Sequence, residues 1–99
     1  PKFQVAASKV YQLTSNNGSL TLYVNKSDVS SIDANVAKNC QDSTKQFYWF
    51  YLRRRTDNGF LLSHILAVYL NKKPFYISNM TPLAPNPYDQ CMIGHFHTR

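Results

Sequence analysis

The feature that most restricts the fold is an Asn17-Gly18 pair between two segments rich in apolar residues. Asn-Gly tolerates the positive φ angles of a two-residue hairpin turn, so the flanking segments are predicted to pair antiparallel. The first segment, residues 3–14, is rich in Val, Tyr and Leu and is predicted as one strand. The second, residues 19–25, alternates strictly between apolar and polar side chains. Its apolar face holds Leu20, Leu22 and Val24.

Residues 47–53 form the most aromatic segment of the chain and are predicted as a third strand. Alternation would place Phe47, Trp49 and Tyr51 on one face and the remaining large side chains on the other. Both faces are aromatic, so the strand is either covered on both sides or presents an exposed aromatic surface. The preceding residues 26–46 are polar and are predicted as a long connection, with a short helical or strand piece around residues 29–36.

The second half of the chain contains one predicted helix, residues 60–71. Its apolar residues recur with helical spacing, and Ser63, His64 and Ala67 fall on the opposite side, where His64 is expected at the surface. Pro74 prevents the helix from continuing. Residues 75–78 and 90–98 are predicted as two further strands, with a proline-rich loop over the eleven intervening positions.

This order of elements predicts a β-rich α+β protein in which all 99 residues form one domain. Five strands with one helix between the third and the fourth have the connectivity of an OB-type barrel, a partly open Greek-key barrel. The same order is compatible with a sheet that carries one helix on a single face. A chain of this length buries a modest core, so we expect a covalent link or a partner to stabilise it.

The two cysteines, Cys40 and Cys91, lie far apart in the sequence and neither belongs to a CxxC pair. They are predicted to form a disulfide rather than two buried thiols, which indicates a secreted or periplasmic protein. In the chain-entropy treatment, a bond that closes so long a loop contributes roughly 4 kcal/mol. The chain begins at Pro1 without a methionine, as is expected of a mature protein after signal removal.

The chain is basic, since 11 Lys and Arg residues oppose 5 acidic residues, all of them Asp, for a net charge of +6. This potential favours anionic partners such as nucleic acid, phospholipid head groups, sialylated glycans or acidic proteins. The longest apolar stretch, residues 60–70, is too short and too often interrupted to cross a membrane, so a soluble protein is predicted.

Residues 46–55 and a few further aromatic residues carry the predicted binding chemistry. Aromatic rings stack on bases and on the apolar faces of sugars, and neighbouring arginines bind phosphates or carboxylates. The stacking candidates are Tyr23, Tyr48, Trp49 and Tyr88, and the anion-binding candidates are Arg53, Arg54 and Arg55.

Catalytic and metal sites have weaker support. Cys91, His95 and an Asp could supply a nucleophile and a base, but no local motif surrounds them, and the predicted disulfide would remove the thiol. His95 and His97 share one face of a predicted strand, as a zinc or copper ligand pair would, but a third ligand is not apparent. We predict a protein without enzymatic activity, metal or cofactor.

The segment over residues 60–78, followed by a proline-rich loop and Cys91-Met92-Ile93-Gly94, resembles the second half of small secreted bacterial OB-fold proteins. These include the B subunits of pertussis-, subtilase- and typhoid-type toxins. The resemblance implies a sheet surface that binds cell-surface glycans, sialylated ones among them. It also implies a homo-oligomer, usually a ring of five, that delivers a catalytic toxin subunit. A related secreted protein that is not a toxin subunit would share the same pattern.

Three functions follow from these observations. The first is a secreted, disulfide-linked OB-like module that binds glycans. The second is a single-stranded nucleic-acid-binding OB-fold protein that uses Trp49, Tyr51 and the arginine run, and whose affinity would fall steeply with salt. The third is a protein–protein interaction or inhibitor module that makes contact through residues 81–89.

Overall fold

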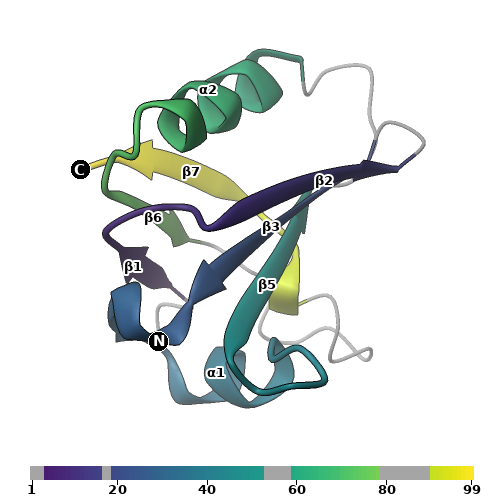
Figure 1. Ribbon diagram of the computed structural model, residues 1–99, viewed down its shortest axis with the longest axis vertical. Coiled ribbons are helices and arrows are strands. Elements are labelled where there is room, and N and C mark those ends of the chain that lie inside the picture. The colour runs from purple at the N-terminus through teal and green to yellow at the C-terminus, as the bar shows by residue number, and fades with distance from the viewer. Residues whose placement is uncertain (1–3, 17–18, 53–58, 79–89) are drawn as a thin grey trace.

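The computed structural model describes residues 4–16, 19–52, 59–78 and 90–99. These residues form seven strands in two antiparallel sheets, together with two α-helices and a short 3-10 helix (Figure 1). In spatial order, the first sheet consists of β4 (Val29–Ile32), β1 (Val5–Ala7), β6 (Phe75–Ser78) and β7 (His95–Thr98). The second consists of β2 (Gln12–Asn16), β3 (Ser19–Asn25) and β5 (Phe47–Leu52). The helices are η1 (Lys26–Asp28), α1 (Ala34–Asn39) and α2 (Gly59–Leu70).

The predicted hairpin is confirmed as β2 and β3. Asn16 pairs with Ser19, so the connection is the two residues 17 and 18, which lie outside the described residues. Burial in β3 follows the predicted alternation, with Leu20, Leu22 and Val24 buried and the residues between them half-buried. The hairpin therefore faces the core with one side and solvent with the other.

The prediction of a single strand over residues 3–14 is wrong, because the chain bends and changes sheets between β1 and β2. At the bend, the Ser8 N–H donates to the Asp28 carbonyl at 2.9 Å, and the Tyr11 N–H donates to the Tyr23 carbonyl at 2.8 Å. Val10, between them, is fully buried. The first part of this segment therefore belongs to the first sheet, as β1, and the second part belongs to the second sheet, as β2.

The polar connection over residues 26–46 contains the short pieces that its sequence predicts. Its strand, β4, pairs antiparallel with β1, with an irregularity in register at Ala6 and Ala7. Its helix, α1, begins at the N-cap Asp33, whose carboxylate accepts from the N–H groups of Asn35 and Val36. The chain therefore changes sheets a second time between β3 and β4, now from the second sheet back to the first.

The last strand is shorter than predicted, since β7 covers only the end of residues 90–98. The residues before it pair with β5 instead, where Met92 forms a parallel bridge with Tyr51 and the Ile93 N–H donates to the Tyr51 carbonyl at 2.8 Å. The β-rich class is therefore confirmed, but the described strands number seven rather than five, and the described sheets do not close into a barrel.

The core lies between the two sheets and is closed at its ends by the helices. Every buried residue in the described part of the chain is apolar or a cysteine. The largest fully buried side chains are Phe50, Phe75, Leu22, Ile65 and Ile77. Helix α2 lies across one end of the molecule, near β2 and β7, and α1 lies at the opposite end (Figure 1).

Helix α2 is confirmed, but only part of its apolar surface is buried against the core, and the rest is exposed. Ile65 and Val68 are buried, whereas Leu62, Leu66 and Leu70 are 40%, 47% and 65% exposed. His64, predicted at the surface, is half-buried. The reason is that the C-terminal strand runs beneath it: His64 Nε2 lies 2.7 Å from Thr98 Oγ1, and the ring meets Phe96 edge-on at 5.5 Å.

The C-terminus of α2 explains how the helix stops. Lys72 has a φ of 54°, in the left-handed region. Its N–H donates to the Tyr69 carbonyl at 3.3 Å, and the Lys73 N–H donates to the Val68 carbonyl at 3.1 Å. These two bonds are the Schellman pattern, which satisfies carbonyls that have no partner within the helix, and Pro74 follows.

The predicted disulfide is confirmed between Cys40 and Cys91, with a Cα–Cα distance of 5.7 Å and a sequence separation of 51. It joins the C-cap of α1 to the segment that precedes β7, and both cysteines are fully buried. Beside it, Asn39 Nδ2 donates to Gln90 Oε1 at 2.8 Å. Among the helices of the described ranges, none combines the length and the apolar character that a membrane crossing requires.

Candidate functional site

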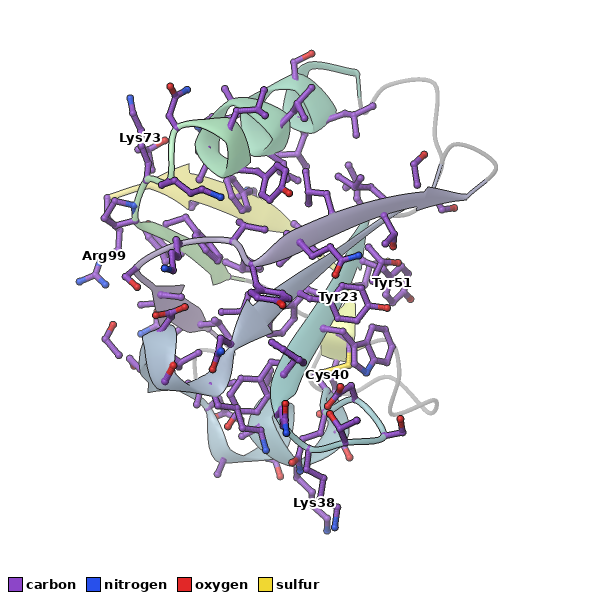
Figure 2. All side chains as sticks on the ribbon, in the orientation of Figure 1. Tyr23, Lys38, Cys40, Tyr51, Lys73 and Arg99 are labelled. Carbon is purple, nitrogen blue, oxygen red and sulfur yellow. A yellow bond between two sulfur atoms is a disulfide. The ribbon has the colours of Figure 1, made fainter. Side chains whose placement is uncertain are left out.

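The outer face of the β2-β3-β5 sheet carries a group of aromatic and polar side chains. The register places Tyr23 opposite Trp49 and Thr21 opposite Tyr51, so these four residues share the face that points away from the core. Gln12 lies on the other side of Tyr23, and Thr14 on the other side of Thr21. Figure 2 shows Tyr23 and Tyr51 close together on this side of the molecule.

Two pairs of rings are stacked on or beside this face. Trp49 and Tyr51 have centroids 6.1 Å apart with an interplanar angle of 29°. Tyr11 and Phe47 have centroids 4.6 Å apart with an angle of 30°. Trp49 Nε1 donates to the Gln41 carbonyl at 3.1 Å, which fixes the indole ring against the turn before β5.

A hollow of about 280 Å³ opens beside the second stacked pair. It is lined by Tyr11, Gln12, Thr14, Tyr23, Asp42 and Phe47. Aromatic rings, an amide, hydroxyls and one carboxylate therefore surround a small volume at the surface. We call this set of six residues the β2-β3-β5 hollow.

The carboxylate of Asp42 is held in a fixed position by the turn before β5. Its Oδ1 accepts from the N–H groups of Gln46 at 3.1 Å and Phe47 at 3.2 Å, and its Oδ2 accepts from Thr44 Oγ1 at 2.6 Å. The Thr44 hydroxyl and these backbone N–H groups hold the pKa of the Asp42 carboxyl below its ordinary value of 3.8. Asp42 is therefore ionised at neutral and mildly acidic pH.

The structure brings together some of the predicted binding residues and separates others. Tyr23 and Trp49 lie side by side on the outer face. Tyr48 lies on the opposite face, the one that the buried Phe50 and Leu52 share, and Lys26 Nζ lies 5.0 Å from its ring centroid. The predicted arginines 53–55 and the tyrosine at position 88 lie outside the described residues.

Of the six residues that line the hollow, sequence reasoning assigned Tyr23 as a binding residue and missed the other five. Phe47 shares the face of Trp49 by alternation, so its position was available from the strand pattern. Asp42 is followed by Thr44 two positions later, which is typical of a turn closed by a side chain. Tyr11 has no local signal, because it reaches Phe47 only through the bend between the two sheets.

Two other hollows lie elsewhere on the described surface. One, of about 450 Å³, is lined by Gln4, Ala6, Ser30, Ser31, Tyr76 and Arg99. It is larger than the β2-β3-β5 hollow but has one aromatic residue, Tyr76, and His97 stacks on that ring at 4.5 Å. The other, of about 290 Å³, lies between α2 and the hairpin and is mostly leucine-lined. We therefore take the smaller, aromatic hollow as the candidate site.

The residues considered for metal binding and catalysis are placed as follows. The rings of His95 and His97 are stacked at 5.9 Å. Within the described ranges, no group of three His, Cys, Asp or Glu residues could hold a metal ion. Cys91 is oxidised in the disulfide, so its sulfur is not a thiolate nucleophile.

A scan against protein-family models finds no matching family, and searches of curated proteins and of solved structures find no match either.

Proposed function

We propose that this protein is a secreted carbohydrate-binding module and that the β2-β3-β5 hollow is its binding site. The observation that carries the proposal is the composition of the hollow, in which a stacked aromatic pair and Tyr23 border an amide, a hydroxyl and a carboxylate. Sugar rings have apolar faces that pack on aromatic side chains and hydroxyl groups that need hydrogen-bond partners. The hollow offers both within one small volume.

The size and rigidity of the hollow support this proposal. Its volume of about 280 Å³ suits a small ligand such as a terminal sugar. Tyr23 projects from a central strand, and the Asp42 turn is held by three hydrogen bonds to its carboxylate. A site built on fixed elements loses little conformational entropy when it binds.

We also propose that the connectivity is that of an OB-type barrel. The bend interrupts the chain between β1 and β2, but if these two segments are counted as one barrel strand, and β3 and β4 as another, the strands number five, with α2 between the third and the fourth. In such a barrel the first three strands pair in sequence, the fourth pairs with the first, and the fifth pairs with the fourth. Because all of these pairings are antiparallel, the third and the fifth strands both run parallel to the first, and therefore to each other. The pairing of β6 with β1 and of β7 with β6, and the parallel bridge from Met92 to Tyr51, support this interpretation.

The proposal of secretion, or of a periplasmic location, rests on the disulfide. Structural disulfides persist in oxidising compartments and are rare in the cytosol. Cys40 and Cys91 are both fully buried. A small domain with a modest core has the most to gain from such a link.

We propose further that the protein forms a homo-oligomer through α2. Leu62, Leu66 and Leu70 form an exposed stripe, since residues four apart lie on one side of a helix. The twelve residues of α2 include no charged side chain, so the helix itself brings no like charges into a contact between two copies. Native mass spectrometry gives the subunit count, and Leu66→Lys should dissociate the assembly; an assembly that persists would contradict the proposal. The association with a catalytic toxin subunit stays a prediction.

The test of the binding proposal is a glycan array followed by calorimetric titration of the best ligand. Tyr23→Ala should weaken binding at least about tenfold, equivalent to ~1.4 kcal/mol. The matched control is Tyr76→Ala, which removes a tyrosine from a strand of the other sheet. No binding by the wild-type protein to any glycan, or equal losses in both variants, would refute the assignment.

The same protein should be titrated with a single-stranded oligonucleotide at low and high salt. Binding that falls steeply with salt would favour the nucleic-acid alternative, because displaced counterions drive such binding. The Asp42 carboxylate argues against that outcome at this hollow, since it would face phosphate groups.

A further inference from the structure

We infer that the β2-β3-β5 hollow selects uncharged sugars and excludes acidic ones, with Asp42 as the residue that makes this selection. The inference rests on the proposed carbohydrate-binding function and names its ligand class. It runs against the expectation from net charge, because a chain of charge +6 would attract sialylated or other acidic glycans.

The hollow itself carries a negative charge. Among the six described residues that line it, Asp42 is the one that carries a charge, and that charge is negative. The lysines nearest to it in the chain sequence, Lys9 and Lys45, are exposed and do not line the hollow. Lys26 is engaged on the other face of the sheet, where its Nζ donates to Gln41 Oε1 and lies over Tyr48.

The carboxylate of Asp42 is held in place by hydrogen bonds to both of its oxygens. Its two oxygens are tied to Thr44, Gln46 and Phe47, and the Asp42 N–H donates to the Phe47 carbonyl at 3.0 Å. Phe47 is also the residue whose ring stacks on Tyr11. The turn therefore holds the negative charge next to the aromatic surface on which a sugar would pack.

The Asp42 carboxylate can accept a hydrogen bond from a ligand but cannot donate one. An ionised carboxylate offers about four acceptor positions, two on each oxygen. Oδ1 accepts N–H bonds from Gln46 and Phe47, Oδ2 accepts one bond from Thr44 Oγ1, and the Lys45 N–H also favours the charged form. Because Asp42 lines the hollow, a sugar hydroxyl can donate a further bond to its carboxylate. A carboxylate or sulfate on a sugar has no proton to donate at neutral pH and would meet a like charge at short range.

The experiment compares matched pairs of glycans that differ only in an acidic sugar, such as lactose with sialyllactose and N-acetyllactosamine with its sialylated form. Dissociation constants are measured for the wild-type protein at low and at high salt. We expect the neutral member of the best-binding pair to bind at least about tenfold more tightly, which is the scale of one like-charge contact near a protein surface. High salt should reduce this ratio, because it screens the repulsion.

The variant Asp42→Asn then tests the residue. It should weaken binding of the neutral glycan and bring the two affinities closer together, because the amide removes the charge. Asp28→Asn is the matched control, since it makes the same change in net charge at η1 and does not line the hollow. It should leave the ratio unchanged.

The possible results separate this inference from the proposal beneath it. If the sialylated glycans bind as tightly as the neutral ones, or if Asp42→Asn leaves the ratio where it was, selection by Asp42 is refuted and carbohydrate binding stands. If no glycan binds at all, both fall. If Asp42→Asn does not fold, the wild-type comparison at two salt concentrations still tests the exclusion of acidic sugars, and equal affinities for the paired glycans would refute it.

Discussion

Removal of the Cys40–Cys91 disulfide should cost this protein a large part of its stability. The bond closes a loop with a sequence separation of 51. In the chain-entropy treatment, the unfolded state gains entropy with the logarithm of that length when the link is cut, which corresponds to about 4 kcal/mol at 25 °C. Folded domains of this size are stable by roughly 5–15 kcal/mol in total. The variant Cys40→Ala/Cys91→Ala should therefore keep about 1–11 kcal/mol, so it should fold but with much less stability than the wild-type protein.

Urea unfolding followed by tryptophan fluorescence measures this effect, because the chain has a single tryptophan, Trp49. The free energy of unfolding should fall by about 4 kcal/mol, and the dependence on urea should become steeper, because an unlinked unfolded chain exposes more surface. Wild-type protein reduced with dithiothreitol is the control and should unfold like the double variant. A loss below about 1 kcal/mol in both samples would show that the link does not act through the unfolded chain in this way.

Three further predictions concern local features. Lys45 has a φ of 60°, which glycine adopts without steric cost, so Lys45→Gly should raise the free energy of unfolding by about 0.5–1 kcal/mol. The control Lys38→Gly, within α1, should lower it by about 1 kcal/mol. Effects of the same sign in urea unfolding would refute the backbone argument. Asp33→Ala should cost about 1 kcal/mol through loss of the α1 N-cap, and Asp33→Asn should retain most of it, so a larger loss in the Asn variant would contradict this explanation. The Asp42 carboxyl has its pKa lowered by the Thr44 hydroxyl, so its stabilisation is present above the unfolded value of 3.8 and is lost as the pH falls through the folded value. The difference in unfolding free energy between wild type and Asp42→Asn should therefore become smaller as the pH falls below 3.8. A difference that does not change with pH would contradict the lowered pKa of Asp42.

Much of the local structure could be predicted from short-range patterns. The hairpin followed from the Asn17-Gly18 pair and the strict alternation of residues 19–25, because both depend on neighbouring residues. The end of α2 before Pro74 is likewise local, since proline has no N–H to continue a helix. The disulfide was predictable because the chain has two cysteines, which leaves one pairing within it.

The sheet arrangement could not be predicted in the same way. Residues 3–14 look like one strand because their composition suits a strand throughout. The bend after β1 depends on the Asp28 and Tyr23 carbonyls, which lie far along the chain and accept from Ser8 and Tyr11. No pattern within residues 3–14 contains those acceptors.

The candidate site shows the same division. Alternation alone predicts that Phe47 and Trp49 share a face of β5 and that Tyr48 does not. Which of the two faces is buried was left open by the sequence, because both are aromatic, and the core decided it by enclosing Phe50 and Leu52. The hollow itself exists because the bend between the sheets brings Tyr11 onto Phe47 while the Asp42 turn reaches the same place from the other side. Contacts between distant segments depend on how the whole chain packs, so local residue patterns do not predict them.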